Sequence, residues 1–294
     1  EKVKNDKLNS IKQTRDIPLQ VAIEEYKHLI FENTPYTNST HEFEKNIPVI
    51  SREDIVKYYN RIFAPQNIVV SINGNVDKDK TIIAFSTMFK STDKEKFAFT
   101  PHIPDIKPLT EAKESIKEAP DTNTDWIFLG WQTAGINNKK DFAALQVIDS
   151  LLGTGMSSRL FKNLRDQEGL AYQLGSSYSA NALKGAFMVY IGTNPQTLEK
   201  SKNMLMAEIN KLKTEFVGTK ELEEAKDKLI GQFILSQETN LDKAATVGWF
   251  ETIGAGYNFT EDYEKLINSV TESDIIEVAN KYFTNNYVLS IVKK

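Results

Sequence analysis

The chain has 294 residues, a length that predicts two domains, each able to bury a core of its own. Its formal net charge of −4 gives no electrostatic reason to expect binding to nucleic acid or to an anionic membrane. The absence of cysteine excludes disulfides, thiolate metal sites and a cysteine nucleophile. The apolar runs are shorter than a membrane-spanning helix requires, so we expect no transmembrane segment.

The first part of the chain predicts helices joined by polar segments, with one strand. Pro35 lies in a polar loop expected over 33–47. Ser51 precedes an apolar helical pattern and is expected to cap that helix at its N-terminus. The run NIVVSINGN over 67–75 predicts a buried strand. The predicted helices of this part cover 1–14, 19–31, 51–63 and 78–89.

The residues from 96 to 120 are rich in proline and charge and show no sustained periodicity, which predicts a connector between domains. We therefore divide the chain into 1–95, the connector 96–120 and a second domain over 121–294. Strands are predicted within the second domain over 124–133, 170–179, 185–192 and 287–292. Its helices are predicted over 142–152, 195–215, 220–238 and 243–252, with a last helix capped by Thr271.

An internal repeat supports this division. The segment IVKYYNRIFAPQNIVVSI at 55–72 parallels IIEVANKYFTNNYVLSI at 275–291, with an offset of 220 residues in the helix and 219 in the strand. The second copy begins near residue 124. At the same offset, the start of the first copy falls upstream of Glu1. The chain is therefore expected to hold two homologous α+β domains, the first one incomplete.

The stretch from Leu151 to Tyr178 has the most specific pattern in the chain. It predicts a helix that ends in a glycine-rich corner, a second helix capped by Ser157 or Ser158, a stop at Gly169, and then a strand. A tight turn at Gly169 would bring the last turn of that helix close to the start of the strand.

This stretch resembles the signature of the C-terminal domain of the M16 peptidases, the pitrilysin and mitochondrial-processing-peptidase family. The shared residues are Ser158-Arg159-Leu160, Arg165 and Gly169-Leu170-Ala171-Tyr172. The resemblance implies that Arg165 and Tyr172, seven positions apart, bind the substrate peptide near the metal. Both side chains can donate a hydrogen bond to a peptide carbonyl. The alternative is an Arg165 paired on the surface with Glu168 or Asp166, beside a half-buried tyrosine.

Catalytic members of this family bind zinc through an H-x-x-E-H helix and a distant glutamate. This sequence has only His28, His41 and His102, and no two of them form such a pair. His28 is expected on a helix surface and the other two in solvated loops. Carried through the repeat, the distant glutamate falls near the start of the chain, so Glu1 is a candidate metal ligand. The alternative, a glutamate on a frayed terminal helix, stays open.

The resemblance implies the C-terminal portion of an M16-type zinc endopeptidase subunit, which positions peptide or unfolded polypeptide for metal-assisted hydrolysis. The alternative is a non-catalytic subunit of an M16 heterodimer, which supplies Arg165 and Tyr172 to the zinc site of a partner. A purely structural member is disfavoured by the Arg–Tyr spacing.

We expect no catalytic residue in this chain. Zinc is expected in the complete enzyme but not in this chain alone, which we predict to be inactive. A homo- or heterodimer with another M16-type chain is also expected. The resemblance allows either the cytoplasm or the periplasm.

Overall fold

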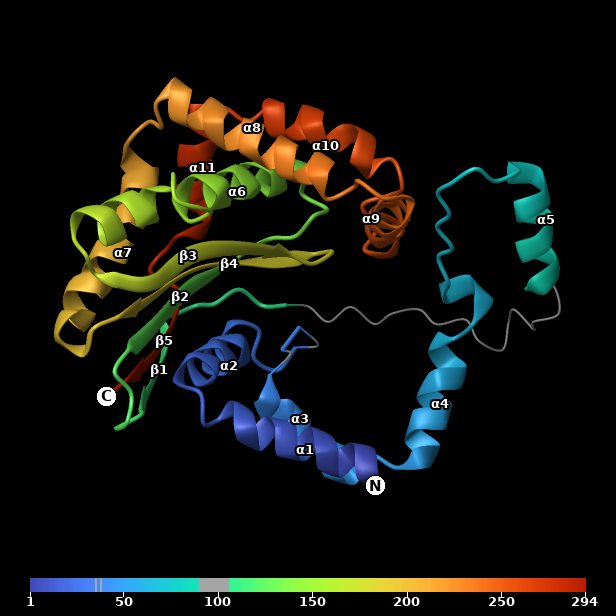
Figure 1. Ribbon diagram of the computed structural model, residues 1–294, viewed down its shortest axis with the longest axis horizontal. Helices are drawn as coiled ribbons and strands as arrows, with labels where there is room; N and C mark the ends of the chain where they lie inside the picture. Colours follow the sequence, from blue (N-terminus) through green and yellow to red (C-terminus); the bar gives the residue numbers. More distant parts are fainter. Residues whose placement is uncertain (35, 38, 90–105) are drawn as a thin grey trace.

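A mixed β-sheet organises the second half of the molecule (Figure 1). The computed structural model describes residues 1–34, 36–37, 39–89 and 106–294, and in this part of the chain the sheet has five strands in the order β1-β5-β2-β4-β3. Strand β5 lies between a parallel neighbour, β1, and an antiparallel neighbour, β2; the pairs β2–β4 and β4–β3 are also antiparallel. The strands are β1 Lys113–Glu118, β2 Asp125–Ala134, β3 Ala171–Ala180, β4 Lys184–Thr193 and β5 Val288–Lys293.

The sequence of β2 explains why both faces of this sheet are covered. Successive side chains of a strand point to opposite faces, and β2 has no polar side chain from Trp126 to Trp131. Ile127 and Trp131 belong to the larger core on one face, whereas Phe128 belongs to a smaller core on the other face. A strand that is apolar on both sides requires a helical layer on each face.

The helices that follow β2 form the layer over the larger core (Figure 1). Thr271 caps α11 as predicted, since its hydroxyl accepts from the Asp274 N–H. Asn138 caps α6, since its side chain accepts from the Asp141 N–H. The helix α10 was not predicted from the sequence. These helices are α6 Lys139–Leu152, α7 Leu198–Thr214, α8 Thr219–Leu235, α9 Asn240–Thr252, α10 Phe259–Asn268 and α11 Glu272–Tyr282, with short turns η3 Phe161–Gln167 and η4 Pro195–Thr197.

The opposite face of the sheet is covered by α2 (Pro18–Ile30), which comes from the first part of the chain (Figure 1). The ring centroids of Tyr26 and Phe128 lie 6.4 Å apart. The Ser290 hydroxyl on β5 donates to the carbonyl of Ala22 at 2.9 Å. Gly130 lies beneath Tyr26, so that a Cβ there would lie 2.6 Å from the ring. The two parts of the chain thus share a core.

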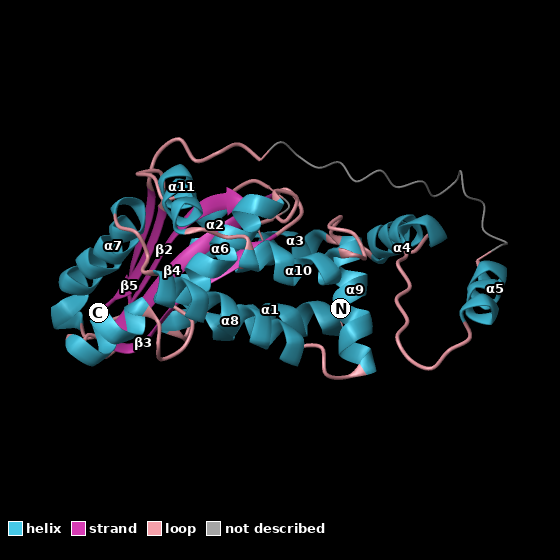
Figure 2. Ribbon diagram, turned by 90° about the horizontal axis from the view of Figure 1, so that it is seen from above, coloured by secondary structure: helices cyan, strands magenta, loops and turns pink. Residues whose placement is uncertain are grey.

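The remaining N-terminal elements are helical. Residues 40–46, predicted as part of a polar loop, form α3, because Glu24 of α2 accepts the N–H of Thr40 at 2.7 Å and so holds the first turn of this helix. The elements are α1 Lys2–Thr14, α3 Thr40–Asn46, η1 Ile47–Val49, α4 Arg52–Ile62, η2 Pro65–Asn67 and α5 Lys78–Met88. Figure 2 shows α4 and α5 lying to one side of the sheet and its helices.

The prediction of a buried strand over 67–75 was wrong. Asn67 belongs to the short turn η2, and residues 74–75 form a bend. Residues 68–73 between them are extended but form no strand, and Ile72 is 44 % exposed. Among the described residues no other strand pairs with this segment. An extended segment without a hydrogen-bonded neighbour does not form a stable strand.

Part of the predicted connector over 96–120 forms regular structure. Its last residues form β1, which pairs with β5 in register from Lys113↔Val288 to Glu118↔Lys293. The charge-rich sequence KESIKE suits an edge strand, where one side of the ladder faces solvent. Residues 96–105 lie outside the described residues. The division at 95 and 121 therefore stays a proposal.

Candidate functional site

Arg165 lies on the short helical segment η3, whose backbone follows a π-helix. Leu160 and Leu164, both fully buried, anchor this segment to the larger core. The hydroxyl of Ser158 donates to the carbonyl of Gly155 at 2.7 Å. The predicted side-chain cap at Ser157 or Ser158 is therefore not formed. Single π-helical turns are rare and occur often at functional sites.

A glycine turn joins η3 to the edge strand β3. Gly169 has φ +63°, a conformation that side-chain-bearing residues rarely adopt, and its N–H donates to the Arg165 carbonyl at 3.1 Å. The Leu170 N–H donates to the Leu164 carbonyl at 2.8 Å. The predicted stop at Gly169 is therefore present, and it reverses the chain within two residues.

Tyr172 occupies a β-bulge at the start of β3. Ala171 pairs with Thr193 and Gln173 pairs with Gly192, so that Tyr172 has no partner residue on β4. A bulge turns the extra residue away from the regular alternation of the strand. Tyr172 is 59 % exposed. The predicted strand is thus present, but its register is interrupted at the residue singled out from the sequence.

The turn brings Arg165 and Tyr172 together. The Arg165 Nη1 lies 3.4 Å from the backbone carbonyl of Tyr172. The guanidinium carbon lies 5.1 Å from the centroid of the Phe161 ring, within the range of a cation–π contact. Glu168, one of the two surface partners of Arg165 in the alternative interpretation, binds Lys200 at 2.6 Å. Both donors are exposed at one edge of the sheet, and their role in substrate binding stays a prediction.

The arginine of the SRL triplet has a supporting role that the sequence alone did not reveal. Arg159 donates through Nε and Nη2 to the two carboxylate oxygens of Glu221, both at 2.8 Å. This fork-shaped pair connects the start of the segment that carries Arg165 to α8. The triplet was visible in the sequence, but its partner is 62 residues away and no local pattern identifies it.

The described residues do not by themselves fit a zinc ion. Glu1 is highly exposed, with 88 % of its side chain accessible, and its nearest ionic partner is Lys4 at 4.0 Å. Within residues 1–34, 36–37, 39–89 and 106–294 no group of three or more His, Asp or Glu side chains could hold a metal ion. A glutamate without further ligands lacks the closed donor set of a zinc site.

Two histidines are closer together than the sequence predicted. The rings of His28 and His41 stack with centroids 4.6 Å apart. His28 Nδ1 lies 3.3 Å from Glu42, and His41 Nε2 lies 3.1 Å from Glu25. His41 is therefore not a freely solvated side chain, because α3 carries it against α2. His102 lies outside the described residues.

The C-terminal half of α6 holds a structural carboxylate, Asp149. Asp149 accepts hydrogen bonds from the Ser176 hydroxyl and, at 3.1 Å, from the Tyr178 N–H of β3. Burial raises the pKa of Asp149, against the opposing effects of these bonds and of the nearby Lys228. Asp149 thus connects α6 to the edge strand β3. It does not belong to any metal-binding group of side chains among the described residues.

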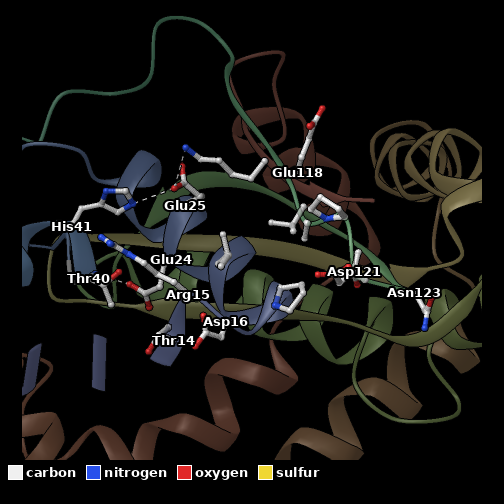
Figure 3. Close-up of a pocket in the computed structure, with 17 residues that line it drawn as sticks. Thr14, Arg15, Asp16, Glu24, Glu25, Thr40, His41, Glu118, Asp121 and Asn123 are labelled. Atoms are coloured by element: carbon white, nitrogen blue, oxygen red, sulfur yellow. Dashed lines mark hydrogen bonds and ion pairs between the residues drawn. The ribbon is translucent and has the colours of Figure 1, made fainter. Parts of the chain in front are cut away.

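A cavity of about 820 Å³ lies beside α1, α2 and α3 and the turn between β1 and β2 (Figure 3). Its two buried carboxylates are already paired within the protein. Glu24 accepts from Lys27 and Thr40, and Glu25 accepts from Ser115 and contacts His41. The cavity therefore has no buried carboxylate left without a partner. No sequence pattern indicated it.

Comparisons with known proteins cover most of the chain. Residues 50–229 match the family model described as the peptidase M16 inactive domain. An uncharacterized zinc protease of Rickettsia bellii is 26 % identical over 286 residues, covering 97 % of this chain and 68 % of that protein. The non-peptidase homolog YmxG of Helicobacter pylori is 26 % identical over 283 residues, covering 95 % of this chain and 63 % of that protein. The chain thus spans about two thirds of these relatives.

Solved structures show the same fold. A protease from Helicobacter pylori has a TM-score of 0.83 at 24 % identity, covering 96 % of this chain and 68 % of that one. The peptidase M16 inactive domain from Pseudomonas fluorescens has a TM-score of 0.84 at 19 % identity, covering 99 % and 69 %. In the described part of the chain, none of the helices is long and apolar enough to cross a membrane. With its α+β fold and its match to the inactive-domain model, the chain belongs to the peptidase M16 family.

Proposed function

We propose that this chain is the substrate-positioning portion of an M16-type zinc endopeptidase, and that Arg165 and Tyr172 hold the carbonyl of an extended peptide. The observation that carries the proposal is the pair itself. Two exposed hydrogen-bond donors are brought to one sheet edge by a π-helical turn, a left-handed glycine and a β-bulge. Irregular backbone of this kind occurs often at functional sites.

The chemistry of the pair suits a carbonyl whose charge grows during the reaction. A guanidinium and a phenol are both donors. Fixed donors stabilise an oxyanion more than they stabilise the uncharged carbonyl from which it forms, and this difference accelerates the reaction. In the complete enzyme, zinc would activate the attacking water and polarise the same carbonyl. The residues described here would bind and orient the peptide.

The edge of β3 sets where a peptide could lie. Asp149 already accepts the N–H of Tyr178, and a Cβ on Gly153 would lie 2.1 Å from the Ser176 nitrogen. The end of α6 therefore covers the edge of β3 at Ser176 and Tyr178. We propose that an extended peptide pairs with β3 on the other side of this contact, next to the two donors.

A second candidate is favoured by the metal observation. The described residues hold no metal-capable group, and one relative is named a non-peptidase homolog. In this reading the chain belongs to a non-catalytic subunit, and Arg165 and Tyr172 act at the zinc site of a partner M16-type chain. In both readings we propose that the chain alone is inactive. Chelator-sensitive cleavage of unfolded polypeptide by the purified chain with added zinc would contradict this.

The test of the positioning role uses Arg165→Ala and Tyr172→Phe in the complete, zinc-loaded protein. Each variant should lower kcat/KM by about 10² to 10³, equivalent to about 3 to 4 kcal/mol, because each removes one donor to the developing charge. The two losses should be less than additive, since both donors serve one carbonyl. Steady-state cleavage of a fluorescently labelled unfolded protein provides the measurement.

The matched controls are Arg52→Ala and Tyr257→Phe, which alter exposed side chains on α4 and on the loop after α9. These controls should cleave at the parent rate. The proposal is wrong if the Arg165/Tyr172 double variant stays folded, retains zinc and cleaves as the parent does.

A further inference from the structure

A buried cluster of hydroxyl groups lies directly behind the bulge that carries Tyr172. The Thr193 Oγ1, at the end of β4, lies 2.8 Å from the Leu170 carbonyl oxygen, from Thr197 Oγ1 and from Ser201 Oγ. Thr193 and Ser201 have no exposed surface. Threonine hydroxyls are common at strand ends, but three partners for one fully buried hydroxyl make a fixed junction.

The donors and acceptors of this cluster can be assigned. The carbonyl of Leu170 can only accept, so the hydroxyl hydrogen of Thr193 must be given to it. The oxygen of Thr193 has two lone pairs and can then accept from both Ser201 and Thr197, whose hydroxyl also lies 3.0 Å from the Asn194 carbonyl. Among these three hydroxyls, Thr193 is the one that reaches Leu170.

Leu170 is held on both sides by this arrangement. Its N–H donates to the Leu164 carbonyl of the segment that carries Arg165, and its carbonyl accepts from Thr193. It lies between the left-handed Gly169 and the bulge at Tyr172. A bulged residue has no opposite partner to fix its direction, so its orientation depends on the backbone just before it.

We propose that Thr193 is a positioning residue for Tyr172. Its hydroxyl fixes the Leu170 carbonyl and, through it, the direction in which the Tyr172 phenol leaves the sheet edge. Thr193 does not touch the peptide. The inference rests on the proposed role of Tyr172 in binding a peptide carbonyl, but the position of Tyr172 can be measured without any substrate.

The first experiment is ¹⁹F NMR of the 294-residue chain labelled with 3-fluorotyrosine. The chain has 11 tyrosines, and the Tyr172 resonance is the one absent from Tyr172→Phe. In Thr193→Val, which keeps the shape but removes the hydroxyl, this resonance should shift or broaden. In Thr193→Ser, which restores the hydroxyl, it should return to the parent position. An unmoved resonance in Thr193→Val would overturn the proposal.

The control is Thr133→Val, a buried threonine on β2 at the opposite end of the sheet. This variant should leave the Tyr172 resonance in place, and an equal shift there would assign the effect to general loosening of the sheet and overturn the proposal. If Thr193→Val does not fold, Thr193→Cys takes its place. Its thiol is a weaker hydrogen-bond donor and should give an intermediate shift of the Tyr172 resonance. A Tyr172 resonance at the parent position in Thr193→Cys would then overturn the proposal.

The second experiment separates this inference from the proposed function. In the complete, zinc-loaded protein, Thr193→Val should lower kcat/KM for labelled unfolded casein by about tenfold to a hundredfold, because misplaced binding groups are costly. Thr193→Ser should restore the rate. If Tyr172→Phe lowers cleavage and Thr193→Val does not, the positioning role fails alone. If Tyr172→Phe also has no effect, the proposed function fails.

Discussion

Two segments of this chain share one sequence pattern and have opposite environments. The segment α4 with residues 68–73 matches α11 with β5 at an offset of 219 to 220 residues. Phe283 is fully buried, whereas Phe63, its counterpart, is 60 % exposed. Ile291 is 3 % exposed on β5, whereas Ile72 is largely accessible in its extended segment.

The difference shows which features a repeat can form by itself. Both helices form, and both begin with a capping box, Ser51 with Asp54 and Thr271 with Asp274. Helix hydrogen bonds and caps are local to the segment. A strand needs neighbours, and β5 has β1 on one side and β2 on the other. The counterpart segment has no neighbouring strand among the described residues, so the same sequence stays unpaired.

The largest effect in this comparison should come from the two phenylalanines. Phe283→Ala should lower the free energy of unfolding by about 3 to 5 kcal/mol, because it opens a cavity beside Trp131 and Phe187, whose rings lie 5.1 and 5.0 Å away. Phe63→Ala should change it by less than about 0.5 kcal/mol. Urea unfolding followed by circular dichroism measures both. Equal losses of unfolding free energy would mean that Phe63 and Phe283 are equally buried in solution.

The next effect concerns two contacts between the first part of the chain and the second. In one, α2 packs against the sheet at Gly130; in the other, α9 contacts the segment around Ser71 at Gly248. Gly130→Ala should cost about 1 to 3 kcal/mol, since its Cβ would meet Tyr26 of α2 and the Phe187 carbonyl at 2.6 and 2.7 Å. Gly248→Ala on α9 would place its Cβ against the Ser71 side chain, 3.1 Å from the Ser71 Cβ and 3.8 Å from the Ser71 Oγ. Its gain in helix propensity, up to about 1 kcal/mol, should offset that contact.

Thermal unfolding of the two glycine variants beside the parent provides the measurement. A stable Gly130→Ala would show that α2 does not press on the sheet in solution. A strongly destabilised Gly248→Ala would show instead that the segment around Ser71 is packed tightly against α9.

The sequence predicted those features that depend on local pattern. The helix predicted over 1–14 is observed over Lys2–Thr14. The cap at Thr271, the stop at Gly169 and the approach of Arg165 to Tyr172 likewise follow from residue spacing and glycine chemistry. The M16-type α+β fold was also predicted, through the signature and the repeat, and it is confirmed.

The features that the sequence missed depend on distant partners. Strand β1 forms because β5 offers a parallel edge some 175 residues further along the chain. The bulge at Tyr172 is defined only by the register of β4. The pairing of Arg159 with Glu221, and of Thr193 with Leu170, joins separate elements. No window of local sequence contains both members of these pairs.

The helix caps should give a smaller effect than the cores. Thr271→Ala should cost about 1 kcal/mol in global stability, because it removes the acceptor of the Asp274 N–H at the start of a packed helix. Ser51→Ala removes the same bond from α4 but should lower the helical content and leave the unfolding midpoint nearly unchanged, since α4 buries none of its residues. Circular dichroism and urea unfolding separate the two outcomes. Equal midpoint shifts would contradict the comparison.

The smallest effect should be the pH dependence of these two caps. Burial alone would raise the pKa of Asp274, but hydrogen bonds from Thr271 and Lys140, together with the Lys140 charge, outweigh it and lower the pKa. A carboxyl whose pKa is lower in the folded state binds fewer protons there than in the unfolded chain. Its stabilisation is therefore present above the unfolded value of about 3.9 and is lost as the pH falls through the folded value.

The stability difference between the parent and Asp274→Asn should accordingly be constant from pH 7 to pH 5 and shrink as the pH falls below about 4. Asp54 has its pKa lowered by the hydrogen bonds of Ser51, in the same direction, but it is exposed to solvent on a helix that packs little. Asp54→Asn should therefore change global stability little at any pH, because solvent screens the charge. Urea titrations of the parent and both variants across this range provide the measurement. If the stability difference between the parent and Asp274→Asn instead grows toward low pH, the charge of the Asp274 carboxylate is unfavourable in the folded state. The start of α11 would then be held by packing and not by this carboxylate.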